Sequence, residues 1–456
     1  MDAFNIVIWL IIGGTSAWGS WRSHRELRIW QRVQGWRRAV AACGFSVMGS
    51  TSRWSGQLQL VAQAWPVQLQ IEGSRRLAAT RIALSGPEPP GHSAVRIHRV
   101  QPDPGAWARE VEIGDEPFDA AFSCAGPTLL VCALLDAKTR ALLSRVNALG
   151  SPTIAGSEIR AETSDQQVSS LLPLLLELRK RFAEPVDVAG SLAENARLDP
   201  VEGVRLRNLL LLARGFASDP RAAAALRTAC SDPSPEIRLR AAIELGAEGR
   251  GFLLELVEKA EDDARCAQAV AALVRGELPQ ERIEEILLQA LRRRHVQTAR
   301  AGLEALGARG NLAAIGTLAK VAAREHGELA AAAARALGAT GSTAAEPPLI
   351  GALDREPADL RLAAADALAT VGSPAAVLPL KEAARRFPHD RDLDRATRQA
   401  IAAIQSRRQG ATPGQLSLAG VEAGQLSLAS DAGGQLSLPG RESGQLSLSG
   451  ETEGQV

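Results

Sequence analysis

Six histidines and a short acidic segment, called the acidic line below, have residue types that could support catalysis or metal binding. The histidines are scattered, and only His326 has carboxylates close by in the sequence, at Glu325 and Glu328. One imidazole with two carboxylates is too small a ligand set for a transition-metal site. Sequence signatures of phosphate-binding loops, serine hydrolases and dinucleotide-binding folds are absent. The sequence therefore predicts no catalytic residue, no cofactor, no metal ligand and no enzyme activity.

The five cysteines are odd in number and set among apolar neighbours, and no Cys-x-x-Cys pair occurs. The pattern therefore indicates neither a zinc site nor a disulfide framework. Buried thiols in a reducing compartment are expected at Cys43, Cys124, Cys132, Cys230 and Cys266.

The formal net charge of the chain is +1 over 456 residues. A protein built as a whole around nucleic acid carries a strong basic excess, so we expect no nucleic-acid partner. The densest basic run, residues 292–295, is interpreted as a solvated helix end rather than a phosphate site.

The acidic line runs from Gly114 through Asp115 and Asp119 and contains two phenylalanines, Phe118 and Phe122. Phenylalanines four residues apart suit a short helical turn buried against a sheet, and Asp115 can cap that turn. A catalytic pair of carboxylates is the alternative, but the pattern favours the structural role. The line resembles one in a group of uncharacterised bacterial membrane-anchored proteins, and this resemblance implies no activity.

Alternation of apolar and polar residues predicts four half-buried strands in the first part of the chain. Glycine and proline between them indicate turns, so an antiparallel sheet is expected. Two helices, predicted over residues 134–146 and 169–182, complete an α+β domain at residues 43–188. The four strands are predicted at residues 57–61, 67–71, 80–84 and 95–100.

A helical sequence pattern with an apolar face, called the repeat phrase below, recurs five or six times between Leu198 and Arg408, at intervals of about 30 residues. A drifting period of this length is typical of a solenoid of helical hairpins, none of which can bury its own apolar face. The anchoring residues are Leu212, Leu245, Leu273, Leu306, Leu337, Leu368 and Ile404.

The clearest copy of this phrase occupies residues 232–246. Its last residue, Gly246, can take the left-handed conformation that stops a helix, and we expect the same ending at Gly307 and Gly338. One face of the helix is expected to be buried through Ile237, Ala241 and Leu245.

The phrase resembles the HEAT family in its short, alanine-rich bacterial form. This resemblance implies an α-solenoid over residues 189–408 that acts as a binding scaffold. Some HEAT-type proteins are di-iron hydroxylases with paired His-Glu ligands, which this sequence lacks, and others are bilin lyases. A HEAT-like-repeat enzyme such as a lyase is therefore the alternative function. The matching residues are Asp232, Ile237, Arg238, Ala241, Ala242, Leu245 and Gly246, then Leu360, Arg361, Ala364, Ala365 and Leu368.

The solenoid predicts an extended concave surface that a protein partner can bind. The helices expected to line it lie at residues 238–245, 299–306, 328–337 and 361–368.

Residues 3–19 are uncharged, which is at the short limit for a membrane span. Six arginines follow by residue 38, so the positive-inside rule places the rest of the chain in the cytoplasm. We expect a transmembrane anchor at residues 1–19 and a basic juxtamembrane helix at residues 20–42, in a single-pass inner-membrane protein. A buried N-terminal helix of a soluble protein is the alternative. The residues of the basic helix expected to face lipid or core are Leu27, Trp30, Val33 and Ala39.

The last part of the chain repeats Gly-Gln-Leu-Ser-Leu from residues 414, 424, 434 and 444. Its glycine-rich composition predicts a disordered tail at residues 409–456. The repeat resembles the core of the peptide by which bacterial proteins dock on the replication sliding clamp, without its final phenylalanine. The copies could instead add to a partner's sheet edge, or be a duplicated linker. The predicted partner-binding residues are Leu416, Leu418, Leu426, Leu428, Leu436, Leu438, Leu446 and Leu448.

The sequence as a whole predicts a multidomain chain: an N-terminal transmembrane helix, an α+β domain with an antiparallel sheet, an all-α HEAT-like superhelical solenoid and a disordered tail. The predicted function is that of a membrane-anchored cytoplasmic scaffold or adaptor. It would bind protein partners through the solenoid and the repeated peptide of the tail.

Overall fold

The computed structural model divides the chain into two compact units, Met1–Leu278 and Pro279–Val456. The first unit holds a β-sheet with its helices and the first helical repeats, and the second holds the remaining repeats. The structure describes residues 26–49, 57–74, 79–100, 111–259, 262–276, 278–407, 416–418 and 426–428.

The sheet of the first unit has eight strands, all paired antiparallel, in the order β1-β2-β3-β4-β8-β7-β5-β6. The four predicted strands are confirmed as β2 to β5. Apolar and polar residues alternate along these strands because one face of the sheet is buried, and this alternation made the strands predictable from the sequence. The strands are β1 Ser46–Gly49, β2 Gln57–Ala64, β3 Val67–Ser74, β4 Ala79–Ser85, β5 Arg96–Arg99, β6 Phe122–Ala125, β7 Gly150–Ala155 and β8 Glu158–Ser164.

The last strands of the sheet were not individually predicted. The hairpin of β7 and β8 inserts between β4 and β5, so its strands pair with residues that are 55 to 85 positions away along the chain, from His98 opposite Thr153 to Ala79 opposite Ser164. Strand β6 begins at Phe122, the last residue of the acidic line, where no strand was predicted. It is extended because it pairs with β5, with Ile97 opposite Cys124.

One face of the sheet forms the core of the first unit. Leu69, Ile71 and Leu84 are fully buried on that face, whereas Gln68 and Arg81, which alternate with them, are exposed. Two helices flank the last hairpin: α4, Ala137–Leu149, precedes β7, and α5, Val168–Ala183, packs on β4 and β8.

A helix over residues 26–42 also packs on the buried face. Trp36 and Val40 are buried, and the Trp36 ring lies so close to Gly73 that a side chain there would collide with it. Arg32 donates to the Ser74 carbonyl at 2.7 Å and forms an ion pair at 2.5 Å with Asp165.

The basic helix predicted from sequence thus faces core rather than lipid along one side. Ala39 is buried and Val33 is half-buried, whereas Leu27 and Trp30 are exposed. Of these four residues, the buried Ala39 and the half-buried Val33 are therefore those closest along the helix to Trp36, which contacts the sheet at Gly73.

The fold class predicted from sequence is wrong on one point, the transmembrane helix. No helix in the described part of the chain is long and apolar enough to cross a membrane. The helix over residues 26–42 carries charged arginines, and the repeat helices are short, at 7 to 16 residues in the ranges given below. The predicted span, residues 1–19, lies outside the described residues, and the inner-membrane location derived from it stays an untested prediction.

Six repeat helices complete the first unit. In α9 the predicted end is confirmed, because Gly246 follows the helix with a φ of 59°. At its start, Ser234 caps the helix and Pro235 lies in the first turn. The six helices are α6 Val188–Leu198, α7 Glu202–Gly215, α8 Pro220–Ala229, α9 Pro235–Glu244, α10 Arg250–Lys259 and α11 Asp263–Arg275.

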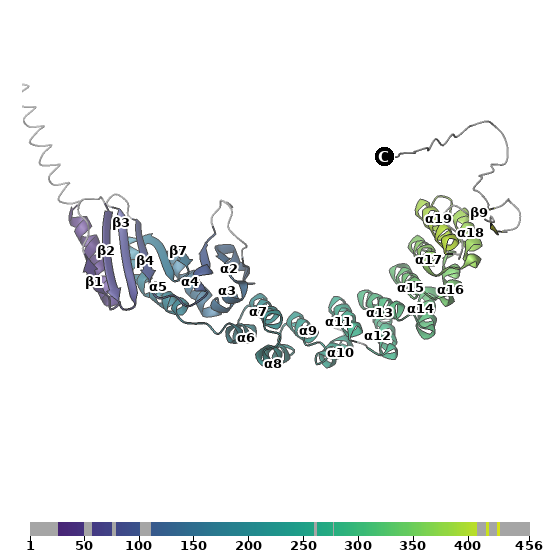
Figure 1. Cartoon of the computed structure of the whole chain (residues 1–456), viewed down its shortest axis with the longest axis horizontal. Coiled ribbons are helices and arrows are strands. Elements are labelled where there is room, and N and C mark those ends of the chain that lie inside the picture. Colours follow the sequence, from purple (N-terminus) through teal and green to yellow (C-terminus); the bar gives the residue numbers. More distant parts are fainter. Residues whose placement is uncertain are drawn as a thin grey trace, which may run out of the picture. The chain divides into compact units, whose positions relative to one another are not determined.

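The second unit contains two rows of helices (Figure 1). Helices α13, α15, α17 and α19 pack one on the next and are called the stacked layer below. Each of α12, α14, α16 and α18 packs against the helix that follows it. The helices are α12 Gln280–Arg293, α13 Val296–Arg309, α14 Leu312–Arg324, α15 Gly327–Ala339, α16 Glu346–Ala352, α17 Ala358–Val371, α18 Val377–Arg386 and α19 Arg391–Ser406.

Gly307 and Gly338 do not end their helices, contrary to the sequence prediction. Helix α13 continues to Arg309 and α15 to Ala339. Both glycines instead allow the stacked layer to pack closely. A Cβ on Gly307 would lie 2.7 Å from the Ala336 carbonyl oxygen, and one on Gly338 would lie 2.7 Å from Ala367 Cβ.

Only the Leu-Ser-Leu segments of the first two tail copies lie among the described residues. Strand β9, Leu416–Leu418, pairs antiparallel with β10, Leu426–Leu428, and Ser417 is opposite Ser427. These two short segments do not test the prediction of a disordered tail at residues 409–456, which stays a prediction. The third and fourth copies lie outside the described residues.

The close approach of α15 and α17 predicts an unusual response to alanine at Gly338. Glycine to alanine inside a helix ordinarily stabilises it by about 0.5–1 kcal/mol. We expect Gly338→Ala to destabilise the protein by roughly 1–3 kcal/mol instead, because the methyl group overpacks the contact with Ala367. Denaturant unfolding monitored by circular dichroism measures the difference.

The matched control is Gly316→Ala in α14, where a Cβ has no neighbouring atom within 4 Å. It should stabilise the protein by the ordinary amount. If both variants were stabilised alike, the packing assigned to Gly338 would be incorrect.

Candidate functional site

The acidic line lies at the start of α2, Glu116–Ala121. Asp115 caps this helix, and its carboxylate accepts a hydrogen bond from the Phe118 N–H at 3.4 Å. Asp119 turns back and accepts from the Ile113 and Gly114 N–H groups at about 3.0 Å. Both carboxylates therefore hold the local backbone in place.

The two phenylalanines of the line stack on each other at the edge of the sheet. The Phe118 and Phe122 rings are 4.8 Å apart between centroids, and both residues are buried. The acidic line thus forms a short capped helix that packs through two stacked phenylalanine rings, and its two aspartates accept hydrogen bonds from different backbone groups.

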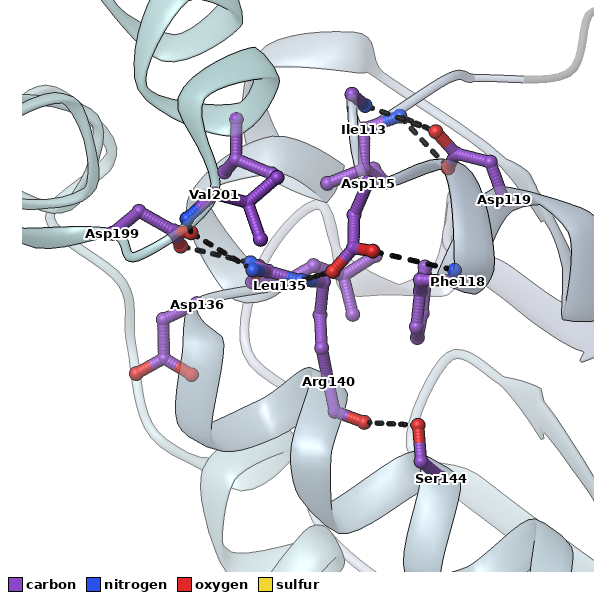
Figure 2. Close-up of polar contacts among 12 residues, drawn as sticks. Ile113, Asp115, Phe118, Asp119, Leu135, Asp136, Arg140, Ser144, Asp199 and Val201 are labelled. Carbon is purple, nitrogen blue, oxygen red and sulfur yellow. Dashed lines mark hydrogen bonds and ion pairs between the residues drawn. The ribbon is translucent and has the colours of Figure 1, made fainter.

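Arg140 on α4 connects this turn to the first repeat helices (Figure 2). Its Nε donates to the Asp115 carboxylate at 2.8 Å. Its two terminal nitrogens each donate to one oxygen of Asp199 at 2.9 Å, a bidentate pair. One of them also donates to the Leu135 carbonyl at 2.9 Å. We call Arg140, Asp115 and Asp199 the buried charge cluster.

The cluster is almost closed to solvent. The Arg140 side chain is 5% exposed and that of Asp199 is 1% exposed. Burial lowers the pKa of Arg140, but its hydrogen bonds with Asp199 and Asp115 outweigh this effect and raise the pKa above its ordinary value. Arg140 is therefore a permanent cation whose donors are occupied by protein acceptors.

The buried charge cluster also positions the start of α7. Asp199 accepts a hydrogen bond from the Val201 N–H at 3.0 Å. Beside it the backbones of Gly114 and Gly203 touch: a Cβ on Gly203 would lie 2.3 Å from the Gly114 carbonyl oxygen. Within the first unit, this cluster is the joint between the sheet and the repeats.

Arg140 and Asp199 were not identified from the sequence. A signal was present, because Arg140 lies three residues before Leu143 and six before Val146, on the apolar face of its helix. A charge at such a position implies a buried partner. The identity of that partner depends on tertiary packing.

The other residues that could bind a metal or act as nucleophiles do not gather in one site among the described residues. Within the described residues, no group of three or more His, Cys, Asp or Glu is placed to hold a metal ion. All five cysteines are free thiols, and burial raises the pKa of Cys132 and of Cys230 to about 11. His92 is buried, with its Nδ1 at 3.1 Å from the Phe182 carbonyl oxygen.

The stacked layer of the second unit carries a different kind of candidate site. Its helices contain three of the four segments predicted to line the binding surface. Four exposed residues of alternating charge occur about one repeat apart in the sequence, on α13, α15, α17 and α19. We call them the charge row: Glu304, Arg335, Asp366 and Arg395.

Two members of the charge row have no internal partner. Arg335 and Asp366 make no hydrogen bond or ion pair with any residue that the structure describes, whereas Glu304 pairs with Arg300 and Arg395 pairs with Asp392. Burial raises the pKa of the Asp366 carboxyl, and Arg395 lowers it in part. Arg335 therefore has no opposite charge paired with it among the described residues, and the Asp366 charge is only partly offset, by Arg395.

Comparison with known proteins identifies the repeats. The family described as HEAT repeats matches residues 317–402, which lie within α14 to α19. This match supports HEAT repeats in that part of the chain. Human deoxyhypusine hydroxylase in complex with glycerol is a similar solved structure, at 18% identity, with 48% of this chain and 96% of that chain covered. Its TM-score of 0.22 means that this likeness carries no argument about activity.

No curated protein matches the chain. The resemblance of the acidic line to membrane-anchored bacterial proteins therefore stays a prediction.

Replacing Arg140 tests the joint. Arg140→Met leaves the Asp199 carboxylate buried without a counter-charge, so we expect a loss of about 3–5 kcal/mol in the free energy of unfolding. Denaturant unfolding of the full-length protein measures it. The matched control is Arg81→Met, which breaks the exposed pair with Glu162 and should change stability little. Equal, small effects of the two substitutions would contradict the role assigned to the cluster.

Proposed function

We propose that this protein is a scaffold that binds protein partners through its HEAT repeats, and that it is not an enzyme. HEAT repeats commonly act as protein-interaction modules, and residues 317–402 match that family. The acidic line, the sequence feature most open to a catalytic interpretation, has both carboxylates engaged in holding the fold. This arrangement supports binding rather than catalysis.

The charge row is the observation that carries this proposal. Exposed charges at equivalent positions of consecutive repeats lie on one rigid layer, because the layer is closely packed through Gly307 and Gly338. Arg335 and Asp366 are unpaired, so a partner can supply the opposite charge. Alternating charges select a partner with a complementary order of charges, and they exclude one with the reverse order.

Reversing the order of the charges tests this surface. Arg335→Asp combined with Asp366→Arg keeps the net charge and leaves the buried residues unchanged. We expect partner association to weaken by about tenfold, which corresponds to about 1.4 kcal/mol of lost interaction. The measurement is quantitative mass spectrometry of proteins that co-purify with the tagged full-length chain.

The matched control is Glu382→Arg combined with Arg385→Glu on α18, where both residues are exposed and outside the stacked layer. This exchange should leave the co-purifying proteins unchanged. If the α15–α17 exchange also left every protein at its wild-type amount, the charge row would not be a binding surface.

We also propose that the repeated peptide of the tail is a multivalent ligand. The four copies are ten residues apart. One copy buries little and must be ordered on binding, so it binds weakly alone. Several copies joined by short spacers keep the local concentration of free copies high, on the order of millimolar. Affinity therefore depends on the number of intact copies.

Substitution of one leucine in each copy tests the tail. We expect stepwise loss of tail-dependent partners as Leu416, Leu426, Leu436 and Leu446 are changed to Ser singly and then together. Co-purifying proteins are compared by mass spectrometry between the variants. A quadruple variant that keeps every wild-type partner would show that the array is a duplicated linker.

A further inference from the structure

A pocket of about 440 Å³ lies among α8, α9, α10 and α11 of the first unit. Its volume is in the range of sites that hold drug-sized ligands, about 300–1,000 Å³. Helix α9 is the clearest copy of the repeat phrase, and nothing in the functions derived above uses this pocket. Its lining combines charged residues with an apolar wall.

Most of the charges in the pocket neutralise one another. Glu255 pairs with Lys259 at 2.6 Å, and this pairing lowers the pKa of Glu255. Asp262 caps α11 by accepting from the Arg265 N–H at 2.8 Å, and it lies 3.6 Å from the Arg265 guanidinium. Three cations and two anions line the pocket, and Arg238 is the cation that forms no ion pair there, although its charge also helps to lower the pKa of Glu255.

Arg238 is held in a fixed orientation by the backbone. One of its terminal nitrogens donates to the Asp232 carbonyl at 2.8 Å and to the Pro233 carbonyl at 3.0 Å. Its Nε and its other terminal nitrogen make no hydrogen bond or ion pair with any described residue. A guanidinium held in place with a free edge is pre-organised to bind a carboxylate.

The wall beside Arg238 is apolar. Phe252 is 40% exposed, although it is a large aromatic residue, and Leu256 lies one helical turn further along α10. Cys230 also lines the pocket, and because burial raises its pKa to about 11 it stays an uncharged thiol at neutral pH. The pocket therefore offers one cation next to a surface that favours an apolar group.

We propose that this pocket binds an acidic side chain of a partner protein, flanked by an apolar residue that packs on Phe252. The inference rests on the proposed scaffold function and names a partner chemistry for a second part of the repeats. The carboxylate pairs with the free edge of Arg238, and the apolar neighbour covers Phe252. A peptide fits this site better than a bare anion, because a single small anion leaves the volume and the aromatic wall unused.

Fluorine NMR of the full-length protein labelled with 4-fluorophenylalanine tests the site directly. The chain has eight phenylalanines, and the Phe252 signal is the one absent from Phe252→Leu. The probe is the capped peptide acetyl-Gly-Leu-Glu-Leu-Gly-amide, and its comparison is the same peptide with Gln in place of Glu. We expect the Phe252 signal to move with the Glu peptide and to need at least tenfold more of the Gln peptide.

Two substitutions separate recognition from folding. Arg238→Gln should weaken the Glu peptide at least tenfold, and Arg238→Lys, which keeps the charge, should recover part of the affinity. Arg227→Gln is the control, because that arginine is exposed on α8 and does not line the pocket. Thermal unfolding of each variant identifies any loss of fold.

An unmoved Phe252 signal, equal binding of the two peptides, or undiminished binding by folded Arg238→Gln would overturn the proposal. Movement with free N-acetylglutamate but not with the peptide would assign the site to a small acid instead. The purified protein and a synthetic probe suffice for this test. Its outcome is therefore separate from that of the co-purification experiments on the charge row.

Discussion

Each helical hairpin of this chain leaves apolar side chains that only the next hairpin covers, and the distance between hairpins is therefore the constraint on which the repeats depend. In the stacked layer that distance is short enough for Gly307 to lie on the Ala336 backbone and Gly338 on Ala367. Only a hydrogen atom fits at these two positions. The rigidity of the layer, and the spacing of the charges it exposes, follow from this packing.

The charged residues fall into two groups according to whether the fold uses them. Arg140 and Asp199 are buried and paired, and with Asp115 they join the sheet to the first repeats. Arg335 and Asp366 are exposed and form no hydrogen bond or ion pair with a described residue, although Arg395 partly offsets the Asp366 charge. The first group contributes stability and orientation. The second group can exchange water for a partner's charges, which is why binding is assigned to the repeats rather than to the acidic line.

The pattern of the sequence predicted those parts of the fold that depend on nearest neighbours. The strands β2 to β5 and the cap and end of α9 follow from local periodicity and from the residues Ser234, Pro235 and Gly246. Strands β7 and β8 were harder to identify, because their place in the sheet depends on pairing with β4 and β5, far away along the chain. The expected transmembrane helix has no counterpart among the described helices.

The sequence by itself determined that the chain contains helical repeats, because a period of about 30 residues and the apolar face within each copy are local properties. It also determined that Gly114, Asp115, Phe118, Asp119 and Phe122 form one motif. Only the tertiary structure decided what that motif contacts. Arg140 and Asp199 are 59 residues apart, and their pairing depends on how a helix beside the sheet packs against the first repeat. Likewise, the packing of α17 against α15 decided that Gly338 allows close helix contact instead of ending its helix. No local sequence pattern specifies how closely two helices approach.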